Sequence, residues 1–267
     1  MSRKTLLAIA IIEAVLIAVL GVLIYFWRYE VLPQSAIKLL QDIPAAQKDQ
    51  VVLVFTIHPD DESIAAGGYI ATAEKNGAEV WITLVTDGNY HGKEQVRDEE
   101  FKKATAILGV PEDHLFFLGY PDHELKKQDL NQVKTRFEEI ISTVRPQVII
   151  APHPKDNHPD HKTAGKIAMD ITAGKNYTVY LYLVHHALFP RPKGLNPHLY
   201  FLPPVRMIVL DSDWGKFMLN EDIETQKHKA ILQYKSQLDD RRDPLLPGLL
   251  LGMLRKNELF AIPNRPQ

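Results

Sequence analysis

The sequence predicts a Rossmann-like α/β fold with three layers and a mostly parallel sheet, preceded by an N-terminal transmembrane helix. From residue 51 onward, short apolar runs rich in β-branched residues alternate with helical stretches. Such alternation is typical of parallel strands that are joined by right-handed helical crossovers and covered on both faces. One long apolar stretch precedes them, and the whole chain of 267 residues suits one large domain.

The first half of the domain supplies two strands, each followed by a helix. Residues 51–57 read VVLVFTI, a continuous apolar run that indicates a buried strand. The helix after it is expected to end at Asn76-Gly77, because glycine suits the position that follows a helix. The second strand is AEVWITLVT, residues 78–86, and a charged helix then runs from about Lys93 to Gly109.

The second half continues the alternation. The third strand, 114–120, leads to a helix over 130–144, and the fourth strand, 146–152, leads to a helix that starts near Asp160. Two further strands and a late amphipathic helix are expected at 177–184, 206–210 and 221–238. The Pro-rich stretch 189–204 is expected to form a long loop over one edge, and loops of this length are often lids or substrate walls.

The N-terminal stretch predicts a membrane anchor. Residues 5–27 are apolar except for Glu13 and are long enough to cross a bilayer, which takes about 20 residues. A cleaved signal peptide is the alternative, but the apolar run exceeds the usual hydrophobic region of such a peptide and no clear A-x-A site follows. We therefore expect an uncleaved signal anchor that holds the protein at a membrane as a single-pass protein.

The charges beside this stretch predict its orientation. Arg3 and Lys4 precede it, whereas Arg28 behind it is balanced by Glu30. The positive-inside rule then places the N-terminus in the cytoplasm and the globular domain outside it. The expected organisation is a signal anchor, a connector and one globular domain, at residues 1–30, 31–50 and 51–267.

Composition excludes some classes of function. The formal net charge of −2 and the pI near 6.6 leave no basic excess that would hold a nucleic-acid backbone, so we expect no nucleic-acid partner. The chain has no cysteine, so any metal must be bound by histidine and carboxylate side chains.

Two clusters of histidine and acidic residues follow two of the expected strands. The first strand runs into HPDDE, residues 58–62, and the fourth into HPKDNHPDH, residues 153–161. In a doubly wound sheet of order 3-2-1-4-5 these two strands are neighbours, and the loops leaving their carboxyl ends open a crevice that binds ligands. The sequence therefore predicts that both clusters meet in one site.

These residue types suit a divalent cation. His58, Asp61 and His161 would form a facial set that leaves a position open for water, and two nitrogens with one carboxylate fit Zn²⁺ best, although other divalent metals remain open. The alternative is that the acids only favour a helix N-terminus. The second cluster argues against it. His158 would be free to act on substrate, with Asp160 close enough to orient it or raise its pKa.

These motifs resemble those of the LmbE-like, or PIG-L, family of zinc-dependent N-deacetylases. HPDDE at 58–62 is similar to the family's first motif and HPDH at 158–161 to its second. TDG at 86–88, VRDEEFKKATAILGV, FLGYPD, YLVHH at 182–186 and the late KHKAILQYKSQ are similar to weaker signatures, so that the resemblance covers about 51–237. Tyr234 departs from the pattern, because many members have histidine there, and this puts part of the substrate pocket in doubt.

The resemblance implies a function and roles for single residues. His58, Asp61 and His161 would bind zinc, Asp60 would be the general base, and His158, assisted by Asp160, would stabilise the oxyanion. Arg97 and Asp122 match positions that contact substrate. Zinc would lower the pKa of a water molecule and polarise an acetamide carbonyl, Asp60 would take the proton of that water, and protonated His158 would stabilise the tetrahedral oxyanion. The implied substrate is an N-acetylglucosamine-type sugar or glycoconjugate, which would release acetate.

Other interpretations stay open at this point. A related hydrolase could cleave another amide or an ester, and a non-catalytic, membrane-anchored sugar-binding protein is a third class. A nucleotide-binding protein is disfavoured, because no G-x-G-x-x-G follows the first strand. The apolar LLPGLLLGML near the C-terminus indicates core or subunit packing, which leaves a homo-oligomer open. Of the histidines outside the two motifs, His153 and His185 could line the pocket, whereas surface or packing roles are expected for His91, His114, His123, His198 and His228.

Overall fold

The computed structural model describes residues 2–29, 32–89, 92–186, 189–208, 212–240 and 245–263. Within them, one sheet has the strand order β1-β7-β8-β6-β5-β2-β3-β4. Its parallel half consists of β2 (Val51–Thr56), β3 (Glu79–Thr86), β4 (Leu115–Tyr120), β5 (Val148–Pro152) and β6 (Thr178–Tyr182). Taken in chain order, these five strands have the order 3-2-1-4-5, as the sequence predicts.

The other half of the sheet was predicted less well. β7 (Ser212–Met218) and β8 (Asn257–Pro263) pair with each other in antiparallel fashion, β8 joins β6, and the sequence predicts neither strand. The strand expected at 206–210 is wrong where the structure describes it, because residues 205–208 form the short helix α6 (Val205–Ile208). Two prolines precede α6, and the N–H of Met207 donates to the carbonyl of Pro204. Proline fixes φ near the helical value at a first turn, which overrides the β propensity of this run.

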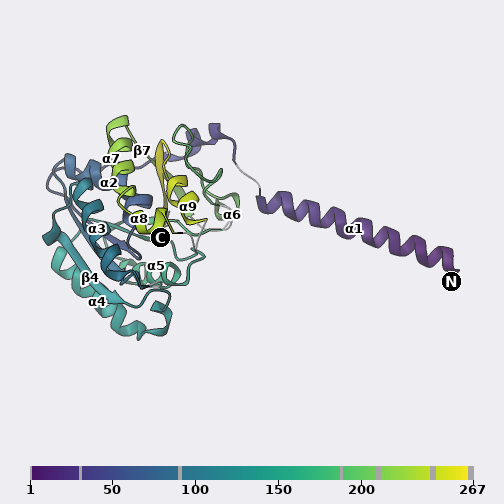
Figure 1. Ribbon diagram of the computed structural model, residues 1–267, viewed down its shortest axis with the longest axis horizontal. Coiled ribbons are helices and arrows are strands. Elements are labelled where there is room, and N and C mark those ends of the chain that lie inside the picture. The colour runs from purple at the N-terminus through teal and green to yellow at the C-terminus, as the bar shows by residue number, and fades with distance from the viewer. Residues whose placement is uncertain are drawn as a thin grey trace.

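Helices cover both faces of the sheet (Figure 1). On one face, α2 (Asp61–Lys75), α3 (Glu94–Leu108) and α7 (Glu221–Ile231) pack against one another, and α4 (Leu130–Val144) packs with α5 (Pro159–Thr172) on the other. The stacked rings of Phe55 and Phe137, with centroids 4.3 Å apart, join β2 to α4 in the core. The helix expected over 221–238 ends at Ile231, and the chain resumes as α8 (Lys235–Leu238). Short 3₁₀ turns and a last helix complete the elements: η1 (Gln34–Leu39), η2 (Glu112–His114), η3 (Leu125–Lys127) and α9 (Leu246–Gly252).

The N-terminal helix α1 (Arg3–Tyr29) extends away from the domain (Figure 1). An 18-residue stretch within residues 3–24 has a mean hydropathy of 3.0 and none of it is buried, so the helix is long and apolar enough to cross a membrane. The predicted connector packs onto the domain: β1 (Gln41–Asp42) pairs with β7, and Ile43 and Ala46 lie in the hydrophobic core.

The register of the sheet positions the site. β2 and β5 are adjacent and parallel, with Val52 opposite Val148 and Val54 opposite Ile150. Their carboxyl ends therefore lie at the same edge, and the loops that carry the two histidine motifs leave from that edge.

Candidate functional site

Three side-chain atoms converge where the two motifs meet. His58 follows β2, Asp61 begins α2, and His161 lies in the first turn of α5. His161 Nε2 lies 3.0 Å from Asp61 Oδ2 and 3.2 Å from His58 Nδ1, and the latter lies 3.5 Å from Asp61 Oδ2. Ligands about 2.1 Å from a tetrahedral ion lie about 3.4 Å apart, so this triangle fits a cation such as Zn²⁺. His58, Asp61, His161 and His185 form a group whose ligand atoms lie within 4.8 Å of one another.

In each of the two histidines of this triangle, the ring nitrogen that points away from the other ligand atoms lies near a carboxylate. The far nitrogen of His58, Nε2, lies 3.0 Å from Asp122 Oδ1, and the far nitrogen of His161, Nδ1, lies 3.6 Å from Asp156 Oδ2. All four side chains are almost fully buried. Such carboxylates fix the tautomer and ring orientation of metal-binding histidines. Burial opposes ionisation of Asp61, but His161 and His58 hold its pKa well below the usual range, so the carboxylate is ready to accept a cation.

Asp60 occupies a strained position beside this triangle. Its φ of 136° lies in a region that non-glycine residues rarely adopt and that costs of order 1–3 kcal/mol. Hydrogen bonds hold it there, because its N–H donates to Glu62 Oε2 at 3.3 Å and its carbonyl accepts from the N–H groups of Ser63 and Ile64 at 3.1 and 3.0 Å. Burial raises the pKa of the Asp60 carboxyl well above its ordinary value, although Arg97 opposes the change.

Arg97 joins Asp60 to Asp122. Its Nη2 donates to Asp60 Oδ2 at 3.3 Å and to the carbonyl of Pro59 at 2.9 Å, while Nη1 donates to Gly88 O at 3.0 Å and to Asp122 Oδ2 at 3.5 Å. Gly88 has a φ of 59°, and a Cβ there would lie 2.8 Å from a carbon of Pro59, so the TDG motif needs glycine. Contact of Arg97 and Asp122 with substrate stays a prediction. Both side chains line the cavity, and both already bind other groups of the protein.

Glu62, the last residue of HPDDE, is held by buried hydrogen bonds beside this loop. It accepts hydrogen bonds from the hydroxyl groups of Ser63 at 2.6 Å and of Tyr234, and burial raises its pKa to about 7. Tyr234 is fully buried and is absent from the lining of the cavity. The departure at Tyr234, which puts part of the substrate pocket in doubt, therefore lies outside the lining of this cavity, and the Tyr234 hydroxyl donates to Glu62.

His158 has a different environment from the one expected. Its Nδ1 accepts a hydrogen bond of 3.3 Å from the backbone N–H of Asp160, while the Asp160 carboxylate accepts from the N–H of Leu125 at 3.1 Å and lies 3.6 Å from His58 Nε2. Burial and then the positive charge of neighbouring histidines lower the pKa of His158 to about 2, so the expected rise of its pKa is not found. A neutral His158 with Nδ1 as acceptor carries its proton on Nε2. That atom lies 3.3 Å from Nε2 of His123.

Asp156 fixes the loop that carries the second motif. Its Oδ1 accepts from the N–H of His158 at 2.8 Å, and its Oδ2 accepts from the N–H groups of Val184 and His185 at 3.0 and 2.9 Å. The loop after β5 is thereby held to the segment after β6, and the ring of His185 lies against that of His161 with centroids 4.8 Å apart.

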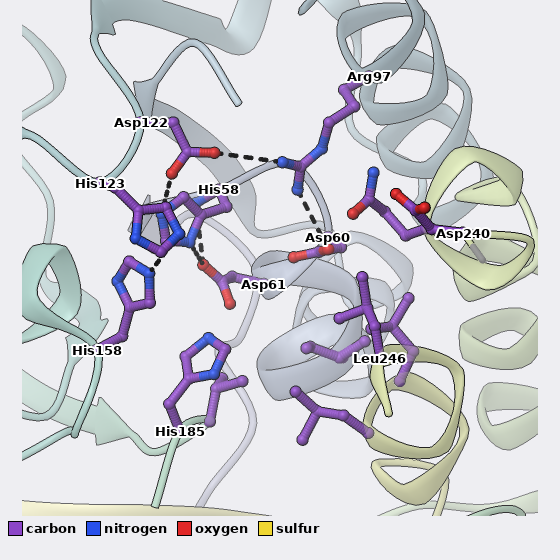
Figure 2. Close-up of a pocket in the computed structure, with 15 residues that line it drawn as sticks. His58, Asp60, Asp61, Arg97, Asp122, His123, His158, His185, Asp240 and Leu246 are labelled. Atoms are coloured by element: carbon purple, nitrogen blue, oxygen red, sulfur yellow. Dashed lines mark hydrogen bonds and ion pairs between the residues drawn. The ribbon is translucent and has the colours of Figure 1, made fainter. Parts of the chain in front are cut away.

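These residues surround a cavity of about 310 Å³ (Figure 2). In Figure 2 the side chains of His58, Asp61, His123, His158 and His185 lie on one side and that of Leu246 on the other. The cavity is lined by His58, Asp60, Asp61, Ile64, Arg97, Asp122, His123, His158, Val184, His185, Gln237, Asp240, Leu246, Leu249 and Leu250.

Several of these residues are not predicted by the sequence. His123 was expected at the surface or in packing, yet it lines the cavity; it stands in the loop after the third parallel strand, at the same sheet edge as the two motifs. His185 lines the cavity as one of the two outcomes considered, whereas His153 is buried, stacks on Trp214 and is absent from the lining. His91 lies outside the described residues. Asp156 had no signal of its own, since an acid in a loop is common.

Fold and site together define a Rossmann-like α/β protein with a group of histidines and carboxylates that could hold a metal ion at the carboxyl edge of its parallel strands. Residues 53–172 match the model of the PIG-L family, which is described as GlcNAc-PI de-N-acetylase. The predicted resemblance to the PIG-L, or LmbE-like, family is therefore confirmed over this part of the chain.

Individual relatives agree with this result. Over 128 residues the chain is 35% identical to "Probable N-acetyl-alpha-D-glucosaminyl L-malate deacetylase 2" of Bacillus cereus, and this match covers 43% of this chain and 57% of that protein. Over 154 residues it is 30% identical to "1D-myo-inositol 2-acetamido-2-deoxy-alpha-D-glucopyranoside deacetylase" of Thermomonospora curvata, and this match covers 45% of this chain and 52% of that protein. The chain thus spans little more than half the length of these curated relatives.

A solved structure shares the fold. The N,N'-diacetylchitobiose deacetylase of Pyrococcus horikoshii has a TM-score of 0.55 and 22% identity, over 80% of this chain and 84% of that one. At this identity the likeness concerns the fold alone.

Proposed function

We propose that this protein is a zinc-dependent N-deacetylase that removes the acetyl group from an N-acetylglucosamine-type sugar or glycoconjugate and releases acetate. The observation that carries the proposal is the triangle of His58 Nδ1, Asp61 Oδ2 and His161 Nε2 with the strained Asp60 beside it. The printed names of the curated relatives, both deacetylases of N-acetylated glucosaminides, support the choice of reaction.

His58, Asp61 and His161 would hold the ion, and their two nitrogens and one carboxylate oxygen suit Zn²⁺. Bound there, a divalent ion would lower the pKa of a water molecule and polarise the carbonyl of the acetamide. Asp122 and Asp156 would keep the two imidazole rings oriented toward the ion, because each faces the far nitrogen of one of them.

Asp60 would act as the general base. Its carboxylate lies in the cavity next to the ligand Asp61 and takes the proton of the attacking water. Because burial raises the pKa of Asp60, the carboxyl can hold this proton and then deliver it to the departing amine. One water molecule is consumed, the C–N bond breaks, and the products are the free amino sugar and acetate.

His158 would stabilise the negative charge that develops on the amide oxygen. Its Nδ1 accepts the Asp160 N–H, so the neutral ring carries its proton on Nε2, and this donor would turn from His123 Nε2, 3.3 Å away, to the amide oxygen of a bound substrate. Removal of one such donor costs about 3 kcal/mol of transition-state stabilisation in other enzymes. Asp160 would thus assist His158 through its backbone N–H, and its carboxylate would support His58.

The helix α1 would anchor the protein in a membrane, with the domain outside the cytoplasm. Its length and mean hydropathy support the anchor. Arg3 and Lys4 in its first turn, ahead of the apolar stretch, support the orientation.

The test is acetate release by the full-length protein loaded with zinc, against N-acetylglucosamine oligomers, a glycolipid and a simple glycoside. Release that requires the metal supports the proposal and ranks the substrates. Stoichiometric zinc without acetate from any of them would favour cleavage of another amide or an ester. Absence of bound metal as well would favour the non-catalytic alternative.

A further inference from the structure

A fourth side chain faces the triangle of His58, Asp61 and His161. One ring nitrogen of His185 lies within 4.8 Å of a ligand atom on each of these three residues. Its ring stands against that of His161 at an angle of 86°, and the two centroids are 4.8 Å apart. Figure 2 shows the ring of His185 directed toward the carboxylate of Asp61. The structure therefore gathers four candidate ligands, one more than the proposed zinc site uses.

The topology of the sheet explains how His185 reaches this place. The strands β2, β5 and β6 are neighbours and run parallel, so their carboxyl ends lie at the same edge of the sheet. His58 follows β2, His161 lies in the helix that follows β5, and His185 comes three residues after the end of β6. Each of three adjacent strands thus delivers one histidine to the same site.

One carboxylate holds the backbone of His185 and also faces the ring of His161. Asp156 Oδ2 accepts from the N–H of His185 at 2.9 Å, and the same oxygen lies 3.6 Å from His161 Nδ1. The carbonyl of His185 accepts from the N–H of Asn157 at 2.6 Å. Because Asp156 is fully buried, these contacts fix the backbone of His185 relative to His161, while the side chain of His185 keeps its rotation about two bonds.

The ring nitrogens of His185 differ from those of the histidines beside it. The far nitrogens of His58 and His161 face carboxylates, and both ring nitrogens of His158 have polar partners. Among the residues that the structure describes, none makes a hydrogen bond or an ion pair with a ring nitrogen of His185. A neutral imidazole has one nitrogen with a lone pair, which can bind a metal ion. The ring of His185 is therefore available as a ligand.

The distances leave a small gap that this ring can close. The three atoms of the triangle are 3.0, 3.2 and 3.5 Å apart, close to the separation of about 3.4 Å between the ligands of a tetrahedral ion. The nitrogen of His185 is farther away, within 4.8 Å of them. Rotation about its two side-chain bonds can shorten this distance while the backbone stays in place.

We propose that His185 is a fourth, displaceable ligand of the metal ion, in addition to His58, Asp61 and His161. This inference rests on the metal site of the proposed function. Structural zinc sites have four protein ligands, whereas catalytic sites have three and keep one position open. His185 therefore retains the ion while the cavity is empty of substrate, and its ring moves away when an oxygen atom of substrate or water takes its place.

The test measures metal affinity and metal coordination in full-length protein in detergent. Zinc affinity is measured by competition with a chelator, and coordination by the visible spectrum of bound Co²⁺, which accepts the same nitrogen and oxygen ligands. In His185→Ala and in His185→Gln, which keeps a polar side chain, zinc affinity is expected to fall by about tenfold or more and the cobalt spectrum to change. His123→Ala is the matched control and is expected to keep both, because His123 lines the same cavity but is absent from the ligand group.

Added imidazole distinguishes a ligand from a ring that only packs beside the site. In cobalt-loaded His185→Ala, imidazole is expected to fill the vacated position and restore the wild-type spectrum, whereas the wild type is expected to change little at the same concentration. An equal response of both proteins, or wild-type zinc affinity in both His185 variants, would overturn the inference and leave the deacetylase proposal standing. Failure of the wild type to bind either metal would overturn the proposed metal site as well.

Discussion

The guanidinium of Arg97 donates a hydrogen bond to the carboxylate of Asp60, with Nη2 and Oδ2 3.3 Å apart. Arg97 comes from α3 and Asp60 from the loop before α2, so the proposed base is held by a cation from another element. Arg97 also keeps the pKa of Asp60 lower than burial alone would make it.

Replacing Arg97 should therefore shift the pH dependence of turnover. In Arg97→Gln the pKa of Asp60 rises further, and because the base works in its ionised form, the acidic limb of kcat/KM moves to higher pH. Arg97→Lys keeps the charge without the forked geometry and should shift the limb less while still lowering kcat. Profiles of both variants and of the wild type check this; an unchanged limb in Arg97→Gln would contradict the contact.

Replacing His161 should remove the metal. His161→Ala deletes one corner of the ligand triangle and leaves Asp61 with one histidine, so zinc affinity should fall by at least a hundredfold. The matched control is His153→Ala, because His153 is just as buried but stacks on Trp214 outside the cavity. Zinc titration of both proteins checks this. Equal retention of zinc would show that His161 is not a ligand.

Glu62 should make the stability of the metal-free protein depend on pH. Burial, the largest effect, raises its pKa from 4.5 to about 7. The folded state binds this proton more tightly than the unfolded state, so the contribution is complete below about pH 4.5 and is lost as pH rises through 7. The loss amounts to roughly 3 kcal/mol.

In Glu62→Gln the side chain does not ionise, so this contribution to the pH dependence is absent. Urea unfolding of the metal-free, full-length protein in detergent between pH 4.5 and 8 should therefore show a weaker fall in the variant than in the wild type. Parallel curves would mean that Glu62 ionises normally in the folded state.

Tyr234→Phe should affect stability more than substrate binding. The change removes the hydroxyl that donates to Glu62 and leaves a buried carboxyl with one donor fewer, which costs about 1–3 kcal/mol of unfolding free energy. The hydroxyl does not line the cavity, so KM should stay within about twofold of the wild type. A large rise in KM with unchanged stability would return Tyr234 to the substrate pocket.

The parallel half of the fold could be predicted because each of its strands is a continuous apolar run next to a helix with clear ends. The strands β7 and β8 could not be predicted in this way. β7 contains polar residues and Gly215, and each strand is defined by pairing with the other, far away in the sequence. The antiparallel edge depends on contacts that no local pattern reports.

The candidate site, like the fold, could be predicted from the sequence only in part. His58, Asp61 and His161 were predictable, because adjacent parallel strands bring the loops after them to one edge. The orientation of single side chains was not. The carboxylate of Asp160 faces His58 although His158 stands only two residues before it, and Glu62 turns away from the ligand triangle toward Tyr234. Such directions depend on the backbone of each turn, for example on the positive φ of Asp60.

The central claim is that one bound ion and Asp60 act together in hydrolysis. The most direct test measures zinc content and acetate release on the same samples of wild-type protein and Asp60→Asn. We expect about one zinc per chain in both, and a loss of 10²- to 10⁴-fold in turnover in the variant, since Asp60 supplies the base and Asp61 remains as the ligand. Near-wild-type turnover in Asp60→Asn, or loss of its zinc, would contradict the assignment.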